Sequence, residues 1–240
     1  MTDVYQPSST DNDLFPVVNE RDEVIGSAPR REVHLKKMRH RAVHVVVFNS
    51  RGEILLQRRS ATKDSYPGWW DISMGGHVDA GEEYEDAVRR ELKEELGIEA
   101  SVKEIGRREA SAESGWEFIR VYECQCDGPF SFPEDEISEL RWIPREQLMV
   151  EAPRLAPSGR RSLLLWAGAD YADVVMVKTS PEEIVQGAWY RMPLLGVGYL
   201  AAYLRENGAI STIVDAMFDQ LSLEETVQRI VAYSPQIIGF

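Results

Sequence analysis

Residues 76–98 restrict the fold of this chain more than any other segment, because a glycine-flanked loop runs directly into an acidic, amphipathic stretch. Four apolar residues of this stretch recur at helical spacing, namely Ala87, Val88, Leu92 and Leu96. Acidic residues fill the first turn, where they suit the helix dipole, and Gly97 follows the last turn. The pattern predicts a helix over Glu83–Leu96 that is capped by Gly97.

Three glutamates of this helix are spaced to share one face. Glu91, Glu94 and Glu95 lie at positions i, i+3 and i+4. Like charges at this spacing repel unless cations lie between them, and carboxylate oxygens are the ligands that Mg²⁺ and Mn²⁺ prefer. Most acidic helix faces are only solvated, but here Glu82 and Arg90 are also placed to pair across two turns. We therefore interpret the face as a metal site.

The same residues fit the pattern G-x5-E-x7-R-E-U-x-E-E-x-G-U, in which U is apolar, from Gly76 to Ile98. This pattern is the signature of the Nudix hydrolases, and residues 15–168 resemble that family. The resemblance implies an α/β/α sandwich with a mixed sheet. It also implies hydrolysis of a nucleoside diphosphate linked to another moiety, or of a related diphosphate.

The resemblance assigns roles to the residues of the motif. Glu91, Glu94 and Glu95 would bind Mg²⁺ or Mn²⁺, with the carbonyl oxygen of Gly75 as a further ligand and Arg90 as a catalytic neighbour. Three residues would have structural roles within the motif, namely Gly76, Glu82 and Gly97.

The general base is left open by the sequence. Glu94 and Glu95 are both candidates, and several Nudix enzymes take their base from a distal loop. That loop would be Pro133–Glu136, whose acidic residues have a simpler interpretation as a solvated turn.

A narrower resemblance connects the chain to type I isopentenyl-diphosphate isomerases and their hydrolase-like bacterial relatives. It rests on several short matches, which are His40–Val43, Gln57–Ser60, Lys63, Pro67–Trp69 and the pair Gly76 and His77. It implies a second metal site at His34, His40 and His77. It also implies that Arg59 and Lys63 contact the substrate diphosphate, which their positive charges suit.

Two departures from the isomerases argue against isomerase activity. Gly75 stands where those enzymes have a catalytic cysteine. Ungapped matching places Phe118 at their second catalytic acid, and Glu117 would need a shift of one residue. An isomerisation by protonation and deprotonation needs both groups. We therefore expect a hydrolase, with an isomerase-like enzyme or a non-catalytic nucleotide- or isoprenoid-sensing module as alternatives.

Most other elements before residue 168 are predicted to be short strands. A disordered lead-in is expected over residues 1–14, followed by two short strands between Phe15 and Gly26. The remaining expected elements are a hairpin of Ala42–Phe48 and Glu53–Arg58, a loop opened by Gly75 and Gly76, strands at Ile98–Ile105, Glu117–Gln125 and Glu139–Ile143, a short helix from Pro144, and a helix at Ser158–Ala167.

Residues 172–240 read as an incomplete doubly wound (Rossmann-like) β-α-β-α-β segment with a parallel sheet. They resemble the first half of the cobalamin-binding domain that precedes radical S-adenosylmethionine domains. No histidine follows His77, so no axial imidazole is available and cobalamin binding is not expected. Because the chain stops inside an apolar strand, we expect a truncated or split product, or a module completed by a second copy or a partner protein.

The composition excludes several classes of partner. The chain of 240 residues has 27 basic and 40 acidic side chains and a net charge of −13, so a nucleic-acid surface is not expected. Its most apolar stretch, residues 192–204, is too short to span a membrane, and no signal peptide is apparent. Two cysteines, Cys124 and Cys126, fit a reducing compartment. A cytoplasmic protein is therefore expected.

Overall fold

The computed structural model describes residues 12–63, 65–111, 114–151, 155–168, 174–178, 195–206, 211–215, 221–233 and 237–239. The chain divides into two compact units, Met1–Ala167 and Gly168–Phe240. The expected lead-in lies outside the described residues as far as residue 11, and Leu14 is already the first residue of a strand.

The first unit is built on a mixed sheet. Its strands are β3 (His40–Phe48), β4 (Ile54–Arg59), β5 (Trp70–Asp71), β6 (Met74–His77), β7 (Lys103–Arg108), β8 (Glu117–Gln125) and β9 (Ile137–Ile143). The order is β5-β4-β3-β8-β7, with β6 paired to β3 and β9 paired to β4. Strands β3 and β8 run parallel and the other pairs are antiparallel. The mixed sheet expected from the sequence is therefore confirmed.

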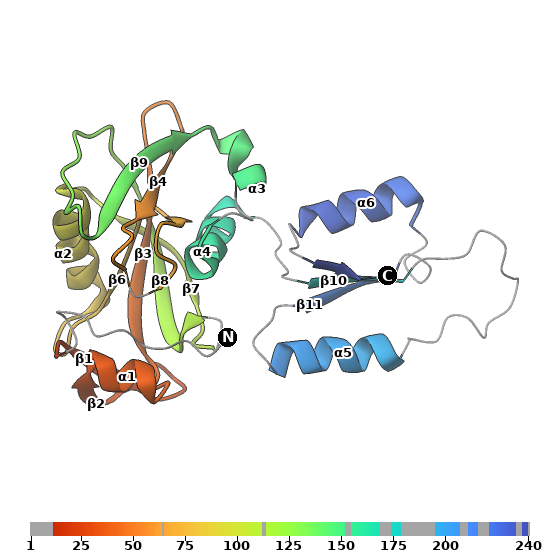
Figure 1. Ribbon diagram of the computed structural model, residues 1–240, viewed down its shortest axis with the longest axis horizontal. Coiled ribbons are helices and arrows are strands. Elements are labelled where there is room, and N and C mark those ends of the chain that lie inside the picture. The colour runs from red at the N-terminus through yellow and green to blue at the C-terminus, as the bar shows by residue number, and fades with distance from the viewer. Residues whose placement is uncertain are drawn as a thin grey trace, which may run out of the picture. The chain divides into compact units, whose positions relative to one another are not determined.

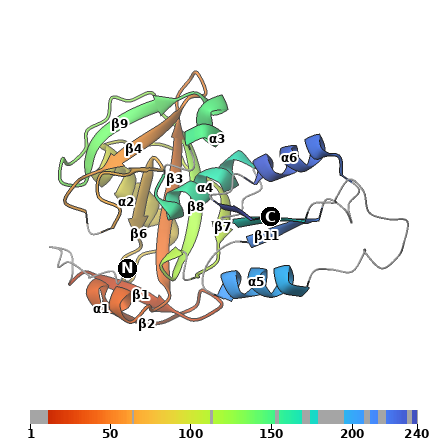
Figure 2. The ribbon, with the colours of Figure 1, turned by 45° about the vertical axis from the view of Figure 1, so that its right-hand side comes forward.

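Helices α2 (Tyr84–Leu96) and α4 (Pro157–Ala167) cover opposite faces of this sheet (Figure 1, Figure 2). Strand β3 supplies both cores because its side chains alternate between the faces. Val43, Val45 and Val47 pack with α2, whereas Val46 packs in the cluster that contains Leu163 of α4. The smaller elements are the hairpin β1 (Leu14–Val18) and β2 (Val24–Pro29), α1 (Arg30–Leu35), the 3-10 turn η2 (Arg145–Gln147) and α3 (Leu148–Glu151).

Strand β6 corrects the expectation of a loop at Gly75 and Gly76. The two glycines pair antiparallel with β3, in the register His44 to Gly75 and Val43 to Gly76. Residues that look like loop formers in isolation are held as a strand here, because the neighbouring backbone supplies the ladder. The consequence is that the glycines lie at fixed positions beside β3.

Two other expectations differ from the structure. The hairpin of β3 and β4 pairs only next to its turn, at Phe48 and Ile54, because β4 continues beside β9 instead. The strand expected at Ile98–Ile105 is observed at Lys103–Arg108. The amide of Ile98 still donates to the carbonyl of Leu92, so Ile98 belongs to the end of the helix rather than to a strand. Helix α1 was not predicted.

The second unit contains a three-stranded parallel sheet in the order β11-β10-β12. Its elements are β10 (Val174–Lys178), α5 (Leu195–Glu206), β11 (Ser211–Asp215), α6 (Leu223–Ala232) and β12 (Ile237–Gly239). Ser222 and Glu225 form the expected capping box, since the Glu225 amide donates to Ser222 Oγ and the Ser222 amide donates to Glu225 Oε2. The predicted β-α-β-α-β order and parallel pairing are confirmed.

Among the described residues, no helix combines the length and apolar character that crossing a bilayer requires.

Candidate active site

Helix α2 positions the three glutamates as the sequence predicts. It begins at Tyr84 and ends at Leu96, and Gly97 follows in the left-handed conformation with φ of 67°. The amide of Gly97 donates to backbone carbonyls of the last turn, which is the glycine cap expected from the sequence. Because the helix is regular between these ends, Glu91, Glu94 and Glu95 lie on neighbouring positions of one face.

Arg90 connects this face to the loop that precedes the helix. Its guanidinium donates to both carboxylate oxygens of Glu82 at 3.0 and 2.9 Å and to the carbonyl of His77 at 2.9 Å. It also donates to Glu91 at 2.9 Å and to Glu94 at 3.1 Å. The pairing of Arg90 with Glu82 is confirmed, and the same side chain also orients two acids of the helix face.

Gly76 lies directly beneath Glu91. A Cβ at residue 76 would be 2.1 Å from Glu91 Cδ, which no real contact allows. Glycine therefore leaves room for the Glu91 carboxylate, which a side chain at residue 76 would displace. This gives the motif glycine a concrete role in the site.

Two of the glutamates lack sufficient positive charge around them. Burial raises the pKa of Glu91 to about 7, although Arg90 opposes the rise. Burial and the charge of Glu91 raise the pKa of Glu95 to about 8, with Lys63 opposing. Glu95 Oε2 is buried and has no hydrogen-bond partner within the described part of the chain. Unpartnered, hard oxygen donors of this kind fit a divalent cation.

The three carboxylates do not converge on one point in this arrangement. The side chain of Glu94 is 59% exposed and forms an ion pair with Arg90. Among the described residues, the acids of α2 do not form a set of three ligand atoms within 4.8 Å of one another. The helix thus brings the acids to one face, but their side chains do not form a closed cage.

Arg59 and Lys63 are held by the loop that joins β4 and β5. The guanidinium of Arg59 donates to the carbonyl of Ser65 at 2.9 Å and lies 3.5 Å from the carboxylate of Asp71. Lys63 forms an ion pair with Glu136, the last acid of the Pro133–Glu136 loop. Both cations that the sequence assigned to a diphosphate therefore lie against carboxylates.

The three histidines come together, as the sequence proposed. His34 comes from α1, His40 begins β3 and His77 ends β6, and their ligand atoms all lie within 4.8 Å of one another. Phe15 stacks on His77 with ring centroids 4.6 Å apart. Burial and the neighbouring histidines lower the pKa of His34 to about 3, so this imidazole is neutral.

Glu117 is the residue of this cluster that the sequence matching did not place securely. It lies in register with His40 on the parallel strand β8, and its Oε1 is 3.2 Å from His77 Nε2 and 3.7 Å from His40 Nε2. Although burial acts to raise the pKa of Glu117, the hydrogen bond with His77 and the nearby His40 ring hold it well below its usual range. The strand register, which matching along the sequence does not contain, brings Glu117 rather than Phe118 to these two histidines.

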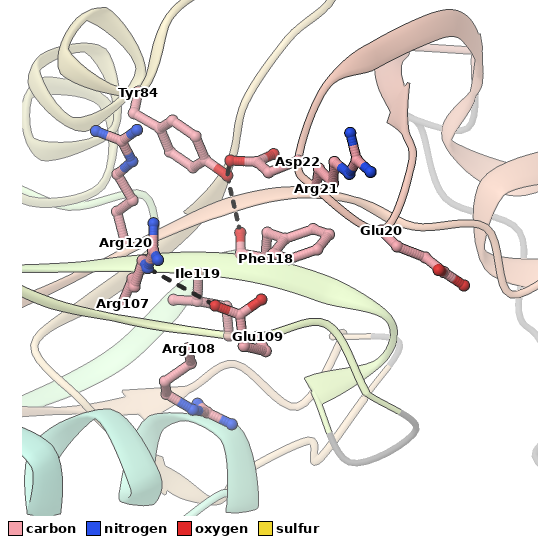
Figure 3. A pocket seen from close by; sticks show the side chains of 10 residues that line it. All are labelled: Glu20, Arg21, Asp22, Tyr84, Arg107, Arg108, Glu109, Phe118, Ile119 and Arg120. Carbon is pink, nitrogen blue, oxygen red and sulfur yellow. Dashed lines mark hydrogen bonds and ion pairs between the residues drawn. The ribbon is translucent and has the colours of Figure 1, made fainter.

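A separate cavity of about 220 Å³ lies beside Tyr84 and is lined by neither the three glutamates of α2 nor the three clustered histidines (Figure 3). Arg120 lies over the Tyr84 ring at 4.3 Å, and the Tyr84 hydroxyl donates to Asp22 at 3.0 Å. Arg107 faces Glu109 at 3.7 Å. Asp22 and Arg120 instead pair with charged residues outside the lining, Arg41 and Glu104 respectively.

The comparison with protein families decides the assignment. The model of the NUDIX domain matches residues 38–167. This chain belongs to the Nudix family. Its hydrolase signature and its mixed-sheet sandwich agree with that assignment, so the protein is a hydrolase of phosphorus-containing anhydrides that acts on small molecules containing a diphosphate.

Relatives and solved structures agree with the Nudix assignment. The uncharacterized Nudix hydrolase YfcD of Salmonella typhi is 34% identical over 181 residues, which covers 75% of this chain and 98% of that protein. The uncharacterized Nudix hydrolase PA4841 of Pseudomonas aeruginosa is 38% identical over 165 residues, 68% of this chain and 98% of that protein. The crystal structure of DR0079 from Deinococcus radiodurans superposes with a TM-score of 0.56 at 33% identity, over 64% of this chain and 98% of that one.

Proposed function

We propose that this Nudix hydrolase is dependent on Mg²⁺ or Mn²⁺ and cleaves the diphosphate linkage of a nucleoside diphosphate derivative or an isoprenoid diphosphate. The observation that carries the proposal is the face of α2. There Glu91 lies against Gly76, and Glu95 presents a buried oxygen without a partner among the described residues. Such oxygens favour a divalent cation over any neutral ligand.

Glu91, Glu94 and Glu95 would hold the cation, together with the carbonyl oxygen of Gly75. When bound, a divalent cation neutralises phosphate oxygens and makes a water molecule more nucleophilic. Arg90 contributes by keeping Glu91 and Glu94 oriented, because its hydrogen bonds restrain both carboxylates. We place residues 15–168 in the domain that performs this chemistry.

The proton of the attacking water has two candidate acceptors in this chain. Glu95 is one, because its carboxylate has a buried oxygen without a hydrogen-bond partner within the described residues. Glu136 is the other, since it is the acid of the Pro133–Glu136 loop that reaches Lys63. Glu94 is less suited, because Arg90 engages its carboxylate. We assign the role to Glu95.

Arg59 and Lys63 would bind the diphosphate. Each now faces a carboxylate, Asp71 and Glu136 respectively. A diphosphate carries the same type of anionic oxygen at higher charge, so it can compete with those carboxylates for the two cations. In this proposal the loop between β4 and β5 is the phosphate-binding side of the site.

His34, His40 and His77 would form a second metal site. Neutral imidazoles with converging nitrogen atoms are good ligands for transition metals, and Glu117 supplies a negative charge beside two of them. His34 Nε2 and His40 Nε2 are buried without a hydrogen-bond partner within the described residues, which is the state expected of ligand atoms.

For residues 172–240 we propose a Rossmann-like segment related to cobalamin-binding domains, without cobalamin itself. A histidine ligand would have to come from elsewhere, because none follows His77. We also propose a cytoplasmic location, on the basis of the two unpaired cysteines.

The test is release of phosphate or pyrophosphate in Mg²⁺ from nucleoside diphosphate derivatives, nucleoside triphosphates and isoprenoid diphosphates. Wild type is compared with Glu95→Gln and with Asp86→Asn, an exposed acid of the same helix that faces only Arg89. Release by wild type and Asp86→Asn but not by Glu95→Gln supports the proposal and identifies the substrate class. Formation of dimethylallyl diphosphate would instead support an isomerase, and binding without turnover would support a sensing module.

A further inference from the structure

Two aromatic side chains are exposed on the loop that carries the cations assigned to the diphosphate. Tyr66 and Trp69 are each 46% exposed, whereas every other Phe, Tyr or Trp that the structure describes in the first unit is buried or half-buried. The two ring centroids lie 5.3 Å apart with an interplanar angle of 64°. Tyr66 and Trp69, called the aromatic pair below, thus form a joint apolar surface that faces solvent.

A Pro-Gly turn brings the two rings of the aromatic pair together. Tyr66, Pro67, Gly68 and Trp69 are consecutive, and the Trp69 amide donates to the Tyr66 carbonyl at 3.2 Å. Proline at the second position and glycine with φ of 74° at the third are the features of a type II turn. Tyr66 itself has φ of 48°, which bulky residues rarely adopt. The turn therefore keeps an aromatic ring where glycine would be less strained, and such strain is typical of functional sites.

The Trp69 side chain lies on the same side of the paired strands β4 and β5 as Arg59. The ladder pairs Arg58 with Trp70. It continues by one position, since the Arg59 amide donates to the Trp69 carbonyl at 2.8 Å. Side chains that lie opposite each other in an antiparallel pair share one face. Asp71, two positions along from Trp69, lies on that face because it forms an ion pair with Arg59.

Hydrogen bonds from two arginines fix the turn of the aromatic pair. Arg59 Nε donates at 2.9 Å to the carbonyl of Ser65, the residue before Tyr66. Arg58 Nε donates at 3.1 Å to the carbonyl of Gly68. The rings are therefore held beside Arg59 before any ligand arrives, which lowers the entropic cost of binding.

The same loop acts electrostatically on the acidic face of α2. Burial raises the pKa of Glu95, and the charges of Lys63 and Arg59 both oppose that rise. A diphosphate bound between these cations and the glutamates has the indole of Trp69 on the side of Arg59. The organic group of the substrate can therefore meet the aromatic pair.

The chemistry of the aromatic pair favours a nucleobase over an isoprenoid chain. A base has a planar π-face that stacks on Trp or Tyr, and its polar edges stay in water. An isoprenoid chain gains mainly from removal from water, which a pair of rings that is itself 46% exposed provides poorly. The aromatic pair therefore distinguishes between the two substrate classes that the acidic face accepts.

We propose that Tyr66 and Trp69 form a stacking surface for the nucleobase of a nucleoside diphosphate substrate, whose diphosphate binds Arg59 and Lys63. This inference rests on the proposed function and selects the nucleoside diphosphate class within it. Tyr66 and Trp69 are then binding residues that determine specificity, and they take no part in the attack on phosphorus.

The direct test is NMR of the indole N–H signals of the six tryptophans in the full chain, with the Trp69 signal assigned by its loss in Trp69→Phe. The ligand is α,β-methylene-ADP, a nucleoside diphosphate analogue that resists hydrolysis, in the presence of Mg²⁺. We expect it to shift the Trp69 signal, whereas methylenediphosphonate, which lacks a base, should leave that signal nearly unmoved. A Trp69 signal that stays in place at saturation with α,β-methylene-ADP would overturn the proposal.

Calorimetry of the same two ligands measures what the rings contribute to affinity. Trp69→Ala should weaken binding of α,β-methylene-ADP roughly 5- to 150-fold, the usual contribution of one stacked base, and leave methylenediphosphonate unchanged. Trp69→Phe, which retains a ring, should keep most of the affinity. Tyr66→Gly should also weaken only the nucleotide, because glycine suits the left-handed backbone there. Tyr199→Ala, which removes a 76% exposed ring of the second unit, is the control and should match wild type.

Two results of the calorimetry would contradict the proposal. One is unchanged affinity for α,β-methylene-ADP in both Trp69→Ala and Tyr66→Gly. The other is a loss of affinity in these variants for the isopentenyl ester of methylenediphosphonate but not for the nucleotide, which would assign the aromatic pair to an isoprenoid chain. If Trp69→Ala loses both ligands because its loop is disrupted, Tyr66→Gly and the spectrum of wild type decide the question.

The proposed function and this inference fail in different ways. If wild type hydrolyses nucleoside diphosphate derivatives but Trp69 responds in neither test, the proposed function stands and this inference falls. If no compound is hydrolysed but α,β-methylene-ADP shifts the Trp69 signal, the hydrolase proposal falls and the aromatic pair remains a nucleotide-binding surface.

Discussion

The acidic face of α2 and the histidine cluster are two sets of metal-ligand side chains that the same domain assembles differently. Glu91, Glu94 and Glu95 come from a single helix, and Arg90 of that helix contacts two of them. The histidines come from α1, β3 and β6 and converge within 4.8 Å, with Glu117 of β8 beside them. One set is local in sequence, whereas the other exists only because a helix and two strands meet.

The acidic face and the histidine cluster also differ in their electrostatics. Burial raises the pKa of Glu91 and Glu95, so the acidic face lacks positive charge. Burial lowers the pKa of His34 and His77, and Glu117 supplies a buried negative charge beside the latter. Both sets would therefore gain from a cation, the acidic face through its glutamates and the histidine cluster through imidazole nitrogens beside one carboxylate. The comparison teaches that one helix can present ligands on one face, whereas the converging ligands come from separate elements that pack together.

Loss of Glu95 should have the largest effect. We expect Glu95→Gln to lower kcat about 10²- to 10⁴-fold, the range for loss of a general base. In wild type, Mg²⁺ should raise the melting temperature, and this rise should shrink in the variant. Turnover is measured beside Asp86→Asn, which should match wild type. Near-normal kcat in Glu95→Gln would remove the acidic face from the mechanism.

Replacement of Gly76, which lies beneath Glu91, should have the next largest effect on the acidic face. Gly76→Ala introduces a Cβ where Glu91 Cδ lies, and we expect a destabilisation of about 1–3 kcal/mol from overpacking. Activity should fall with it because Glu91 is displaced. Denaturant unfolding and turnover measure both. Gly26→Ala, where a Cβ meets nothing within 4 Å, is the control. Equal stability of the two variants would contradict the close contact.

Replacement of Glu117, the carboxylate beside the histidine cluster, should weaken metal binding by the cluster. We expect the full chain to bind Co²⁺ with visible absorption bands even when Glu95 is replaced by Gln. Glu117→Gln should weaken that binding roughly 10- to 100-fold, as loss of a ligand-orienting carboxylate does. Glu109→Gln, an exposed acid paired with Arg107, should leave it unchanged. Binding that is lost in Glu95→Gln but kept in Glu117→Gln would reverse the comparison.

Asp71 belongs to neither set and tests whether burial alone raises a carboxyl pKa in this domain. Burial raises the pKa of Asp71 from 3.8 to about 6, although Arg59 opposes the rise. A raised pKa means that the folded state binds more protons, so its contribution to stability is full below pH 3.8 and is lost as pH rises to about 6. Asp71→Asn lacks this titration.

We therefore expect the difference in unfolding free energy between Asp71→Asn and wild type to move in favour of the variant between about pH 4 and 6, by on the order of 1 kcal/mol. It should be constant above that range. Urea unfolding across this range measures it, and using the difference removes the titration of other carboxyls. A difference that does not depend on pH would show that Arg59 fully compensates the burial of Asp71.

The parts of the site that follow from local rules could be predicted. The spacing of Glu91, Glu94 and Glu95, the Arg90 to Glu82 pairing and the Gly97 cap depend on residues within a few turns of one helix. Helical geometry relates such positions without any knowledge of the rest of the chain. The three histidines were predicted differently, because they match positions of metal ligands in the family that the chain resembles.

Other features required the packed structure. Gly75 and Gly76 form a strand only because β3 pairs with them, and Glu117 meets His40 only through the register of two parallel strands. The contact of His44 with Ser162 joins residues 118 positions apart. Strand pairing depends on backbone groups that nearly all residues share, so the local sequence does not reveal which distant strand is the partner.

The sequence by itself determined the helix, its acidic face and the chemistry that such a face favours. The tertiary structure decided which side chains meet across the sheet, where the histidines gather and which imidazole borders Gly75. The physical reason is the distance along the sequence over which each effect acts. Helical periodicity acts over a few residues, whereas register and burial are set jointly by the whole domain.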